Sequence, residues 1–272
     1  MTEKFNISGR IVVMTGACGV LGSTIVKYFA GEGAKVVLLD LERTRETGER
    51  LVAEIKATGG EALFLPTNVL EQGVLENNLQ DILAAYGGID VLLNAAGGNM
   101  SGATIAPDKT YLDLDTAAFR NVVDLNLFGT VLPTKVFGGV MCEKKEGCIV
   151  NFCSEAALRP FTRVVGYSAA KSAIASYTKF MAAEMAMKYS PRIRVNAIVP
   201  GFIITNQNRT LLTNEDGSLT DRGKTIIAHT PAGRFSEPEE LLGTIHYLIS
   251  EASSFVTGAL SIVDGGFDAF SI

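Results

Sequence analysis

Short apolar runs rich in β-branched residues alternate with stretches of helical length along nearly the whole chain. This alternation constrains the fold most, because strands separated by helices join through right-handed crossovers into a parallel sheet with helices on both faces. The runs contain few polar residues, as expected for strands buried on both sides. We therefore predict an α/β fold, a doubly wound parallel sheet of about seven strands in a single domain. The expected strands are 11–15, 35–40, 61–65, 90–94, 148–152, 194–199 and 260–264, and the expected helices are 21–32, 45–58, 71–86, 115–143, 166–189 and 238–250.

One segment, residues 201–234, interrupts this rhythm. It contains no expected strand and is rich in asparagine, threonine and charged residues. A long excursion inside a compact domain usually has a function, often as an active-site lid. We expect one domain over residues 1–272, with 201–234 as a substrate lid.

Composition excludes several classes of protein. The 272 residues are 47% hydrophobic, and the net charge of −5 is not gathered in any block, which argues against a nucleic-acid or anionic-membrane surface. The four cysteines form no C-x-x-C pair and there are only two histidines, so we expect no metal site. No signal-peptide pattern and no apolar run of membrane-spanning length is evident, so we expect a cytoplasmic protein without a membrane partner.

A glycine-rich turn connects the first expected strand to the first expected helix. Gly16, Gly19 and Gly22 lie within it. Glycines allow a tight turn and a close approach of the backbone to a pyrophosphate, and the helix N-terminus adds N–H donors. A plain tight turn has the same composition, but this position in the chain favours a dinucleotide site.

Asp40 ends the second expected strand. A carboxylate there accepts hydrogen bonds from the ribose hydroxyls of NAD and repels the 2′-phosphate of NADP. NAD is therefore the expected cofactor. Arg43 and Arg45 follow closely and leave NADP as the less favoured alternative, and a simple turn cap is the alternative role of Asp40.

Tyr167 and Lys171 are four residues apart, on one face of an expected helix. A neighbouring ammonium favours the phenolate and can lower the pKa of tyrosine, ordinarily about 10, by about 1–3 units. Ser154 follows the fifth expected strand, the segment 94–97 follows the fourth, and Pro200 follows the sixth. These side chains should therefore meet at one sheet edge, where open α/β sheets bind ligands.

Together these motifs resemble the short-chain dehydrogenase/reductase family, which has a Rossmann fold, and the resemblance covers nearly the whole chain. It rests on Thr15–Gly22, Asn94–Gly97, Ser154, Tyr167–Lys171 and the ending Val256–Gly266. The chain departs from the family at Val20, where the middle glycine of the turn usually stands, and at Asn68, where the family often has aspartate. The resemblance implies cofactor contacts from Gly16, Cys18, Gly19, Val20, Leu21, Gly22, Asp40, Leu41, Asn68, Val69, Asn94, Ala95, Ala96, Gly97, Tyr167, Lys171, Pro200, Gly201, Ile203 and Thr205.

The resemblance also implies a catalytic tetrad. Tyr167 would exchange the proton of the reacting hydroxyl, and Ser154 would donate a hydrogen bond to the substrate oxygen. Lys171 would hold the nicotinamide ribose and favour the phenolate, while Asn126 would order water beside Lys171. The implied reaction is hydride transfer between nicotinamide and a CH–OH group.

The lid is similar to that of a subgroup described as D-mannonate oxidoreductases, or fructuronate reductases, which suggests a sugar acid as the small-molecule substrate. A carboxylate needs a cation, ideally the forked guanidinium of arginine. Arg159, between Ser154 and Tyr167, is the expected partner, with Arg163 and Arg209 as alternatives and surface charges as the simplest alternative for all three. We expect Asn99, Ser154, Arg159, Tyr167 and Arg209 to contact the substrate.

Other functions stay open at this point. The enzyme could act on gluconate-type acids, other polyols or a 3-oxoacyl carrier, and a remote alternative is a cofactor-sensing regulator without catalysis, although such proteins lose the tyrosine or lysine present here. Of the two histidines, we expect His229 to form hydrogen bonds in the lid and His246 to lie on a helix surface. The long helices carry more small residues than one sheet face can cover, and by resemblance they would pair in a homotetramer. These include Ala169, Ala170, Ala173, Ala175, Ala182, Ala183 and Ala186.

Overall fold

A computed structural model describes residues 3–205 and 208–271 and confirms the expected sheet. Seven parallel strands follow the order β3-β2-β1-β4-β5-β6-β7, so the chain reverses its direction of winding between β1 and β4. Each expected strand is present, with ends that shift by at most one residue. The strands are β1 (Ile11–Thr15), β2 (Lys35–Asp40), β3 (Glu61–Pro66), β4 (Val91–Asn94), β5 (Gly147–Phe152), β6 (Ile193–Pro200) and β7 (Leu260–Val263).

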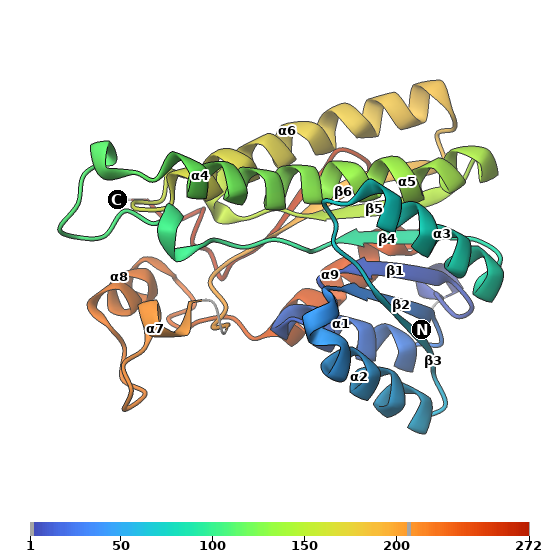
Figure 1. Cartoon of the computed structure of the whole chain (residues 1–272), viewed down its shortest axis with the longest axis horizontal. Coiled ribbons are helices and arrows are strands. Elements are labelled where there is room, and N and C mark those ends of the chain that lie inside the picture. Colours follow the sequence, from blue (N-terminus) through green and yellow to red (C-terminus); the bar gives the residue numbers. More distant parts are fainter. Residues whose placement is uncertain (1–2, 206–207, 272) are drawn as a thin grey trace.

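Helices cover both faces of the sheet (Figure 1). One buried cluster joins the sheet to α1 (Val20–Gly31), α2 (Arg45–Ala57) and α9 (Leu242–Ile249). A second cluster joins the opposite face to α3 (Gln72–Tyr86), α5 (Gly129–Lys144) and α6 (Val165–Lys188). The central strands β4 and β5 are buried along their whole length, which explains their continuous apolar sequence. Short 3₁₀ turns occur at Glu3–Phe5, Glu42–Thr44, Ser101–Ala103, Tyr111–Asp113, Glu155–Ala157, Pro238–Leu241 and Glu251–Ser253.

The helix expected over 115–143 is divided by a π-helical turn. Helix α4 (Thr116–Val123) continues through the π turn Asp124–Phe128 into α5. A π turn inserts one extra residue into the helical ladder, and such insertions are frequent at functional sites. Here the turn contains Asn126, which is fully buried.

The helical run Thr116–Lys144 is long and apolar enough to cross a membrane by length and composition, and 44% of its most apolar window is buried. Within this fold it is a core helix, because Val136, Phe137 and Met141 pack against the sheet. It is not an uninterrupted apolar run, because Arg120, Asp124 and Lys135 lie within it, so it agrees with the expectation from the sequence.

The segment 201–234 stands apart from the two helical layers (Figure 1). It contains α7 (Arg209–Leu212) and α8 (Asp221–His229), while Asn206 and Gln207 lie outside the described residues. Leu212 and Ile226 anchor these helices in a separate apolar cluster with Phe267 near the C-terminus. His229 packs edge-on against Phe267, with ring centroids 4.7 Å apart.

His246 corrects one sequence expectation, because it is only 3% exposed. Its Nε2 lies 2.7 Å from the carbonyl oxygen of Phe5, and its Nδ1 lies 2.9 Å from the hydroxyl of Tyr28. The side chain joins α9 to α1 and to the N-terminal turn. The spacing of residues in the helix predicted an exposed His246, but α1 and the N-terminal turn cover this side of α9.

Candidate active site

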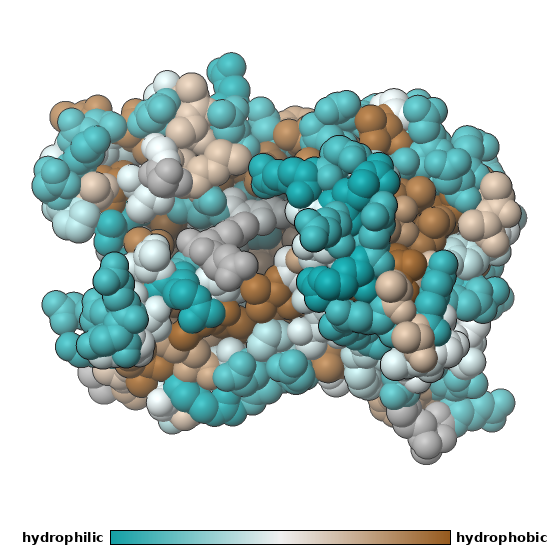
Figure 2. Space-filling view, turned by 60° about the horizontal axis from the view of Figure 1, so that its bottom comes forward, coloured by the Kyte–Doolittle hydropathy of each residue, from teal (hydrophilic) through white to brown (hydrophobic). Residues whose placement is uncertain are grey.

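A cavity of about 570 Å³ lies at the carboxyl ends of the central strands and extends beneath the segment 201–234. It brings Ser154, Tyr167 and Lys171 together with residues that are far from them in the sequence, such as Leu21 and Arg222. The space-filling view shows one face of the molecule hollowed, with hydrophobic side chains exposed inside the hollow (Figure 2). Of the residues expected at the site, the cavity is also lined by Leu21, Ala95, Gly97, Asn99, Pro200, Gly201, Ile203 and Thr205.

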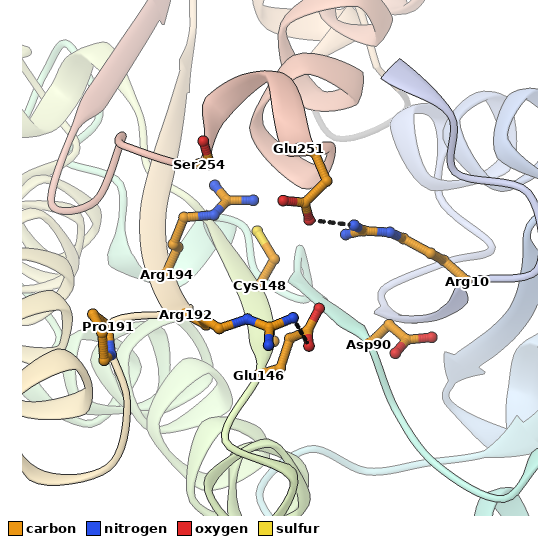
Figure 3. A pocket seen from close by; sticks show the side chains of 10 residues that line it. Arg10, Asp90, Glu146, Cys148, Pro191, Arg192, Arg194, Glu251 and Ser254 are labelled. Carbon is orange, nitrogen blue, oxygen red and sulfur yellow. Dashed lines mark hydrogen bonds and ion pairs between the residues drawn. The ribbon is translucent and has the colours of Figure 1, made fainter. Parts of the chain in front are cut away.

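A second, smaller cavity of about 110 Å³ lies at the opposite, amino edge of the sheet (Figure 3). Its charged side chains are already paired: Arg10 contacts Glu251 at 2.6 Å, and Arg192 contacts Glu146. Arg194 donates hydrogen bonds to the carbonyls of Leu248 and Ser250. Among the described residues, each charged side chain at this smaller cavity therefore has a partner within the protein.

Lys171 and Tyr167 lie together in the larger cavity, as their spacing on α6 predicts. The Lys171 Nζ is 5.5 Å from the centre of the Tyr167 ring and donates a 2.7 Å hydrogen bond to the carbonyl of Phe152. Burial lowers the pKa of Lys171 to about 8. Burial also raises the pKa of Tyr167, and the hydroxyl of Ser154 only partly opposes this. The pKa of Tyr167 is thus raised where the sequence predicted that Lys171 would lower it, because burial penalises the charged phenolate.

Ser154 lies two residues after the end of β5, in extended conformation, and caps the turn Glu155–Ala157. Its Oγ accepts a hydrogen bond from the backbone N–H of Ala156 at 3.2 Å. The hydroxyl proton remains available to a group in the cavity. Serine suits this position because one hydroxyl can accept from the turn and donate into the cavity at once.

Asn126 holds the loop that follows β4. Its Oδ1 accepts from the N–H of Gly98 at 3.1 Å, and its Nδ2 donates to the carbonyls of Gly98 at 2.7 Å and Val122 at 2.8 Å. A Cβ on Gly97 would lie 2.6 Å from this Oδ1, so only glycine permits the contact. Both amide protons of Asn126 are used, which makes it a support of the loop.

Thr15 has a role that the sequence analysis missed. It is fully buried at the end of β1, and its Oγ1 accepts hydrogen bonds from the N–H groups of Ala95 and Ala96 at 3.1 and 3.0 Å. The side chain of Asn94 points into the core, where its Nδ2 donates to Thr134 and Asn151 at 2.9 Å. Asn94 thus ties β4 to β5 and α5, and no sequence signal distinguishes this role from a ligand contact.

The glycines of the first turn serve different purposes. Gly16 has a φ of +67°, and a Cβ on Gly22 would lie 2.4 Å from the carbonyl oxygen of Gly16, so the turn itself requires both. A Cβ on Gly19 would meet only one atom, at an ordinary 3.5 Å. The protein therefore gives no packing reason for glycine at position 19. Gly19 directly precedes α1, where free N–H groups point outward and a phosphate could approach, so the turn fits a dinucleotide.

Asp40 faces this turn. Its Oδ2 accepts from the N–H of Cys18 and its Oδ1 from the N–H of Leu41, each at 2.8 Å. Asn68 is bonded locally, donating to Glu71 at 2.6 Å and accepting from the N–H of Leu70 at 3.1 Å. Val69 is buried against Gly129. A Cβ added to Gly129 would lie only 3.0 Å from the Val69 side chain. Asp40 therefore remains the one acidic side chain of the expected cofactor set.

The arginines differ from expectation. Arg159 pairs with Asp268, its Nε 2.9 Å from Oδ1, and does not line the cavity. Arg209 is exposed on α7 and does not line it either. Arg163 and Arg222 do line the cavity, and neither forms an ion pair with any residue in the described part of the chain. Burial, followed by the charge of Arg163, lowers the pKa of Arg222.

Arg163 also has an unusual backbone. Its φ of +76° is in the left-handed region, which is strained for a residue with a Cβ and is typical of functional sites. Its Nε donates to the carbonyl of Ile105 at 2.9 Å, which fixes the guanidinium and leaves its two terminal nitrogens for another partner. Arg222 was not among the candidate residues, because nothing in the sequence of the lid separates it from a surface arginine.

Comparison with known proteins agrees with the fold and identifies the family. The short chain dehydrogenase family model matches residues 10–216. Oxidoreductase UxuB of Bacillus subtilis, itself uncharacterized, is 41% identical over 98% of this chain and 97% of its own. The chain therefore belongs to the short-chain dehydrogenase/reductase family and is an oxidoreductase that uses a nicotinamide cofactor.

Two solved structures are similar over their full length. A protein from Haemophilus influenzae, provisionally described as a D-mannonate oxidoreductase and containing bound NAD, is 40% identical with a TM-score of 0.91, and the match covers 98% of this chain and 97% of that one. A gluconate 5-dehydrogenase from Burkholderia cenocepacia, in complex with NADP and tartrate, is 28% identical with a TM-score of 0.86 over 99% of both chains.

Proposed function

We propose that this protein transfers hydride between NAD and a sugar acid of the D-mannonate/D-fructuronate kind. The observation that carries the proposal is the pair Arg163 and Arg222, two guanidinium groups on the cavity wall without an ionic partner among residues 3–205 and 208–271. Two neighbouring cations repel each other in a partly buried site unless an anion joins them. A carboxylate at one end of a polyhydroxylated chain would do so.

The reacting carbon would lie at the other end of the cavity. There Tyr167 would take the hydroxyl proton in oxidation and return it in reduction, and Ser154 would donate a hydrogen bond to the same oxygen. Lys171 would hold the ribose and, once its charge is fixed there, favour the phenolate of Tyr167. Asn126 would support the loop 97–99, which lets Asn99 contact the substrate. The bound nicotinamide supplies the hydride acceptor.

NAD is the proposed cofactor because Asp40 lies beside the glycine turn, where its carboxylate would accept from a ribose hydroxyl and repel a 2′-phosphate. The Haemophilus structure contains NAD, whereas the Burkholderia structure contains NADP. The family uses both cofactors, so Asp40 is the feature of this chain that supports the choice. The turn Thr15–Gly22 and the loop Asn94–Gly97 would hold the rest of the cofactor.

The substrate proposal differs from the first expectation in its arginine. The charge of Arg159 is neutralised by Asp268. Arg159 would therefore attract a substrate carboxylate less strongly than Arg163 and Arg222, which form no ion pair among the described residues. D-gluconate is the second candidate, because it has the same carboxylate and the Burkholderia relative is a gluconate 5-dehydrogenase. In either case the lid, residues 201–234, would close the acid end of the cavity through Arg222 on α8.

A comparison of acids with neutral polyols tests this proposal. D-mannonate, D-gluconate and D-mannitol would be assayed with NAD, using the unmutated protein and the variants Arg163→Ala, Arg222→Ala and Arg209→Ala. Loss of a partly desolvated charge-assisted contact should lower kcat/KM for the acid about 30- to 1,000-fold in the first two variants and change mannitol oxidation little. The exposed Arg209 is the matched control and should leave both substrates unaffected.

Two outcomes would contradict the proposal. If the unmutated enzyme ignores both acids and oxidises mannitol, the substrate is a neutral polyol and the sugar-acid assignment fails. If Arg163→Ala and Arg222→Ala reduce both substrates equally, these arginines only stabilise the lid.

We also propose a homotetramer in the cytoplasm. Helix α6 leaves Phe180 63% and Met187 81% exposed, and only Ala170 and Ala182 of its seven noted alanines are buried within the chain. Such apolar surface supports pairing between copies of this chain. The net charge of −5 supports a protein without a nucleic-acid or anionic-membrane partner.

A further inference from the structure

Glu155 is a buried acid in an unusual environment. It begins the short turn Glu155–Ala157 between β5 and α6 and is 1% exposed. Neither of its carboxyl oxygens has a hydrogen-bond partner within residues 3–205 and 208–271. Buried polar groups are nearly always hydrogen-bonded, so this exception requires an explanation.

The charges around Glu155 come mainly from residues 264–271, which we call the C-terminal clasp. Asp264 and Asp268 of the clasp oppose ionisation of Glu155, and Arg159 is the cation that favours it. Arg159 is already committed to the clasp, because its Nε lies 2.9 Å from the carboxylate of Asp268. Among the described residues, one cation therefore serves three carboxyl groups.

The remaining titratable neighbour of Glu155 is the thiol of Cys153, whose own pKa is raised by burial. The charge of Lys171, on α6, bears on Cys153 and not on Glu155. Burial, followed by Asp264 and Asp268, raises the pKa of Glu155 to about 8. The side chain is therefore neutral at neutral pH and ionises as the solution becomes alkaline.

The C-terminal clasp also holds the end of the lid, residues 201–234. The N–H of Ala232 donates a 3.0 Å hydrogen bond to the carbonyl of Gly265. The ring of His229 packs edge-on against Phe270, with centroids 5.1 Å apart, as it does against Phe267. A displaced clasp would therefore release the end of α8.

The clasp reaches the cavity as well. Phe161 and Phe202 line the cavity wall, and their ring centroids lie 5.7 and 5.1 Å from that of Phe267. The position of the clasp therefore sets the position of this aromatic wall.

Ionisation of Glu155 would place a third carboxylate beside those of Asp264 and Asp268. Like charges repel strongly where little water screens them. Glu155 is fixed between β5 and α6, two core elements, so the clasp is the part that moves away. We propose that Glu155 is a pH switch, whose ionisation in alkaline solution displaces the C-terminal clasp, loosens the lid and weakens substrate binding. Only the last of these steps rests on the proposed function.

Limited proteolysis tests the switch without substrate or cofactor. Trypsin would be added at pH 6.5 and at pH 9.5 to the unmutated protein, to Glu155→Gln and to Glu215→Gln, a control at an exposed glutamate of the lid. Cleavage after Lys224, whose side chain is 66% exposed on α8, reports the state of the lid.

Glutamine cannot ionise, so Glu155→Gln should keep the lid closed at both pH values. At pH 9.5 the unmutated protein and Glu215→Gln should be cut after Lys224 at least about ten times faster than Glu155→Gln, and at pH 6.5 all three rates should agree within about twofold. Comparison at one pH removes the pH dependence of trypsin and the titration of Lys171. Equal cleavage of all three proteins at pH 9.5 would overturn the inference.

A nuclear magnetic resonance titration of the unmutated protein needs no variant that folds. With ¹³C at the glutamate carboxyls, one signal should titrate above pH 7, whereas an ordinary glutamate titrates near about pH 4.3. The chain has only two histidines, so their ring signals report the clasp. The signals of His229 should move with the same midpoint as this glutamate, and those of the distant His246 should not. If no glutamate titrates above pH 7, or if His229 does not respond, the switch does not exist.

The effect on the substrate is measured last. Between pH 6.5 and pH 9.5, KM for D-mannonate should rise at least about fivefold more in the unmutated enzyme than in Glu155→Gln. An equal rise in both would exclude the last step, because it would belong to a group that they share. If D-mannonate is not oxidised at any pH, the proposed function fails, while the proteolysis and the titration still decide the switch.

Discussion

At the residue scale, the site combines a tyrosine and a lysine whose pKa values burial moves in opposite directions. Burial lowers the pKa of Lys171 to about 8 and raises that of Tyr167, so both groups are held closer to their neutral forms. Tyrosine then suits donation of a proton, and its use as a base requires a charge to be fixed on Lys171. The ribose that Lys171 is proposed to hold would help to fix that charge.

The proton-transfer role gives the most direct prediction at this scale. Tyr167→Phe removes only a hydroxyl that lies beside Ser154 at the cavity, so folding and cofactor binding should persist. Turnover should fall by at least about 10²- to 10⁴-fold, as expected for a lost general acid–base. NADH formation at saturating substrate, with circular dichroism and a cofactor titration as controls, measures this. Activity near the unmutated level would remove Tyr167 from the mechanism.

Cofactor choice is a second prediction at the residue scale. NAD should bind more tightly than NADP to the unmutated protein, because the Asp40 carboxylate beside the N–H of Cys18 would repel a 2′-phosphate. Asp40→Ala should reduce the ratio of NADP to NAD dissociation constants by at least about tenfold. Quenching titrations with the two reduced cofactors compare the affinities directly. Tighter NADP binding before mutation would contradict the assignment.

Residue types in sequence predicted part of this site and missed the rest for a physical reason. Ser154, Tyr167 and Lys171 could be assigned because strand ends and helical spacing place them on one edge. Arg159 was preferred because it lies between Ser154 and Tyr167, yet its partner Asp268 is more than a hundred residues away in the chain. Such long-range neutralisation leaves no local signal, and neither does the lack of an ionic partner for Arg222 among the described residues.

At the scale of elements, strands were predicted more closely than the segments that shape the site. Apolar runs buried on both faces have sharp ends, as β4 and β5 show. The π turn Asp124–Phe128 could not be predicted, because its apolar pattern continues that of the flanking helices. The segment 201–234 was singled out by the absence of an expected strand, but the apolar cluster of Leu212, Ile226 and Phe267 that anchors it forms only in three dimensions.

The junction of β1 and α1 yields a prediction that separates packing from ligand binding. In Gly22→Ala the added Cβ would lie 2.4 Å from the carbonyl oxygen of Gly16, so α1 must shift, at a cost of about 1–3 kcal/mol in the free energy of unfolding. In Gly19→Ala the Cβ has ordinary space, so stability should change by less than about 1 kcal/mol. NAD affinity should nonetheless fall at least about tenfold in Gly19→Ala, because the methyl group occupies the approach of the pyrophosphate.

Chemical denaturation and NAD titration of these two variants distinguish the roles. A stable Gly19→Ala protein that binds NAD normally would mean that the phosphates do not approach position 19. The substitution Gly243→Ala is a control, because a Cβ there meets nothing within 4 Å.

At the scale of the whole molecule, two apolar surfaces remain exposed on one chain. The first, the helix surface, consists of Phe128, which directly precedes α5, and of Phe180 and Met187 on α6. Their exposed fractions are 47%, 63% and 81%. The second, the edge surface, lies at β7, the last strand of the sheet, where Phe255 is fully exposed and Ile262 is 43% exposed. An uncovered edge strand with apolar side chains is a ready pairing surface.

Two independent surfaces determine the assembly that should form. One isologous surface produces a dimer, whereas two of them, each about its own two-fold axis, produce a closed tetramer. We therefore predict that the double variant Phe180→Glu, Met187→Glu is a dimer joined through the edge surface, and that Phe255→Glu is a dimer joined through the helix surface. All three substitutions together should leave a monomer. Leu112→Glu, at an exposed residue of the turn Tyr111–Asp113 that belongs to neither surface, should stay a tetramer. Light scattering coupled to size-exclusion chromatography measures each mass. A monomeric unmutated protein would refute the assembly, and a tetramer that survives either substitution would show that the surface concerned is not an interface.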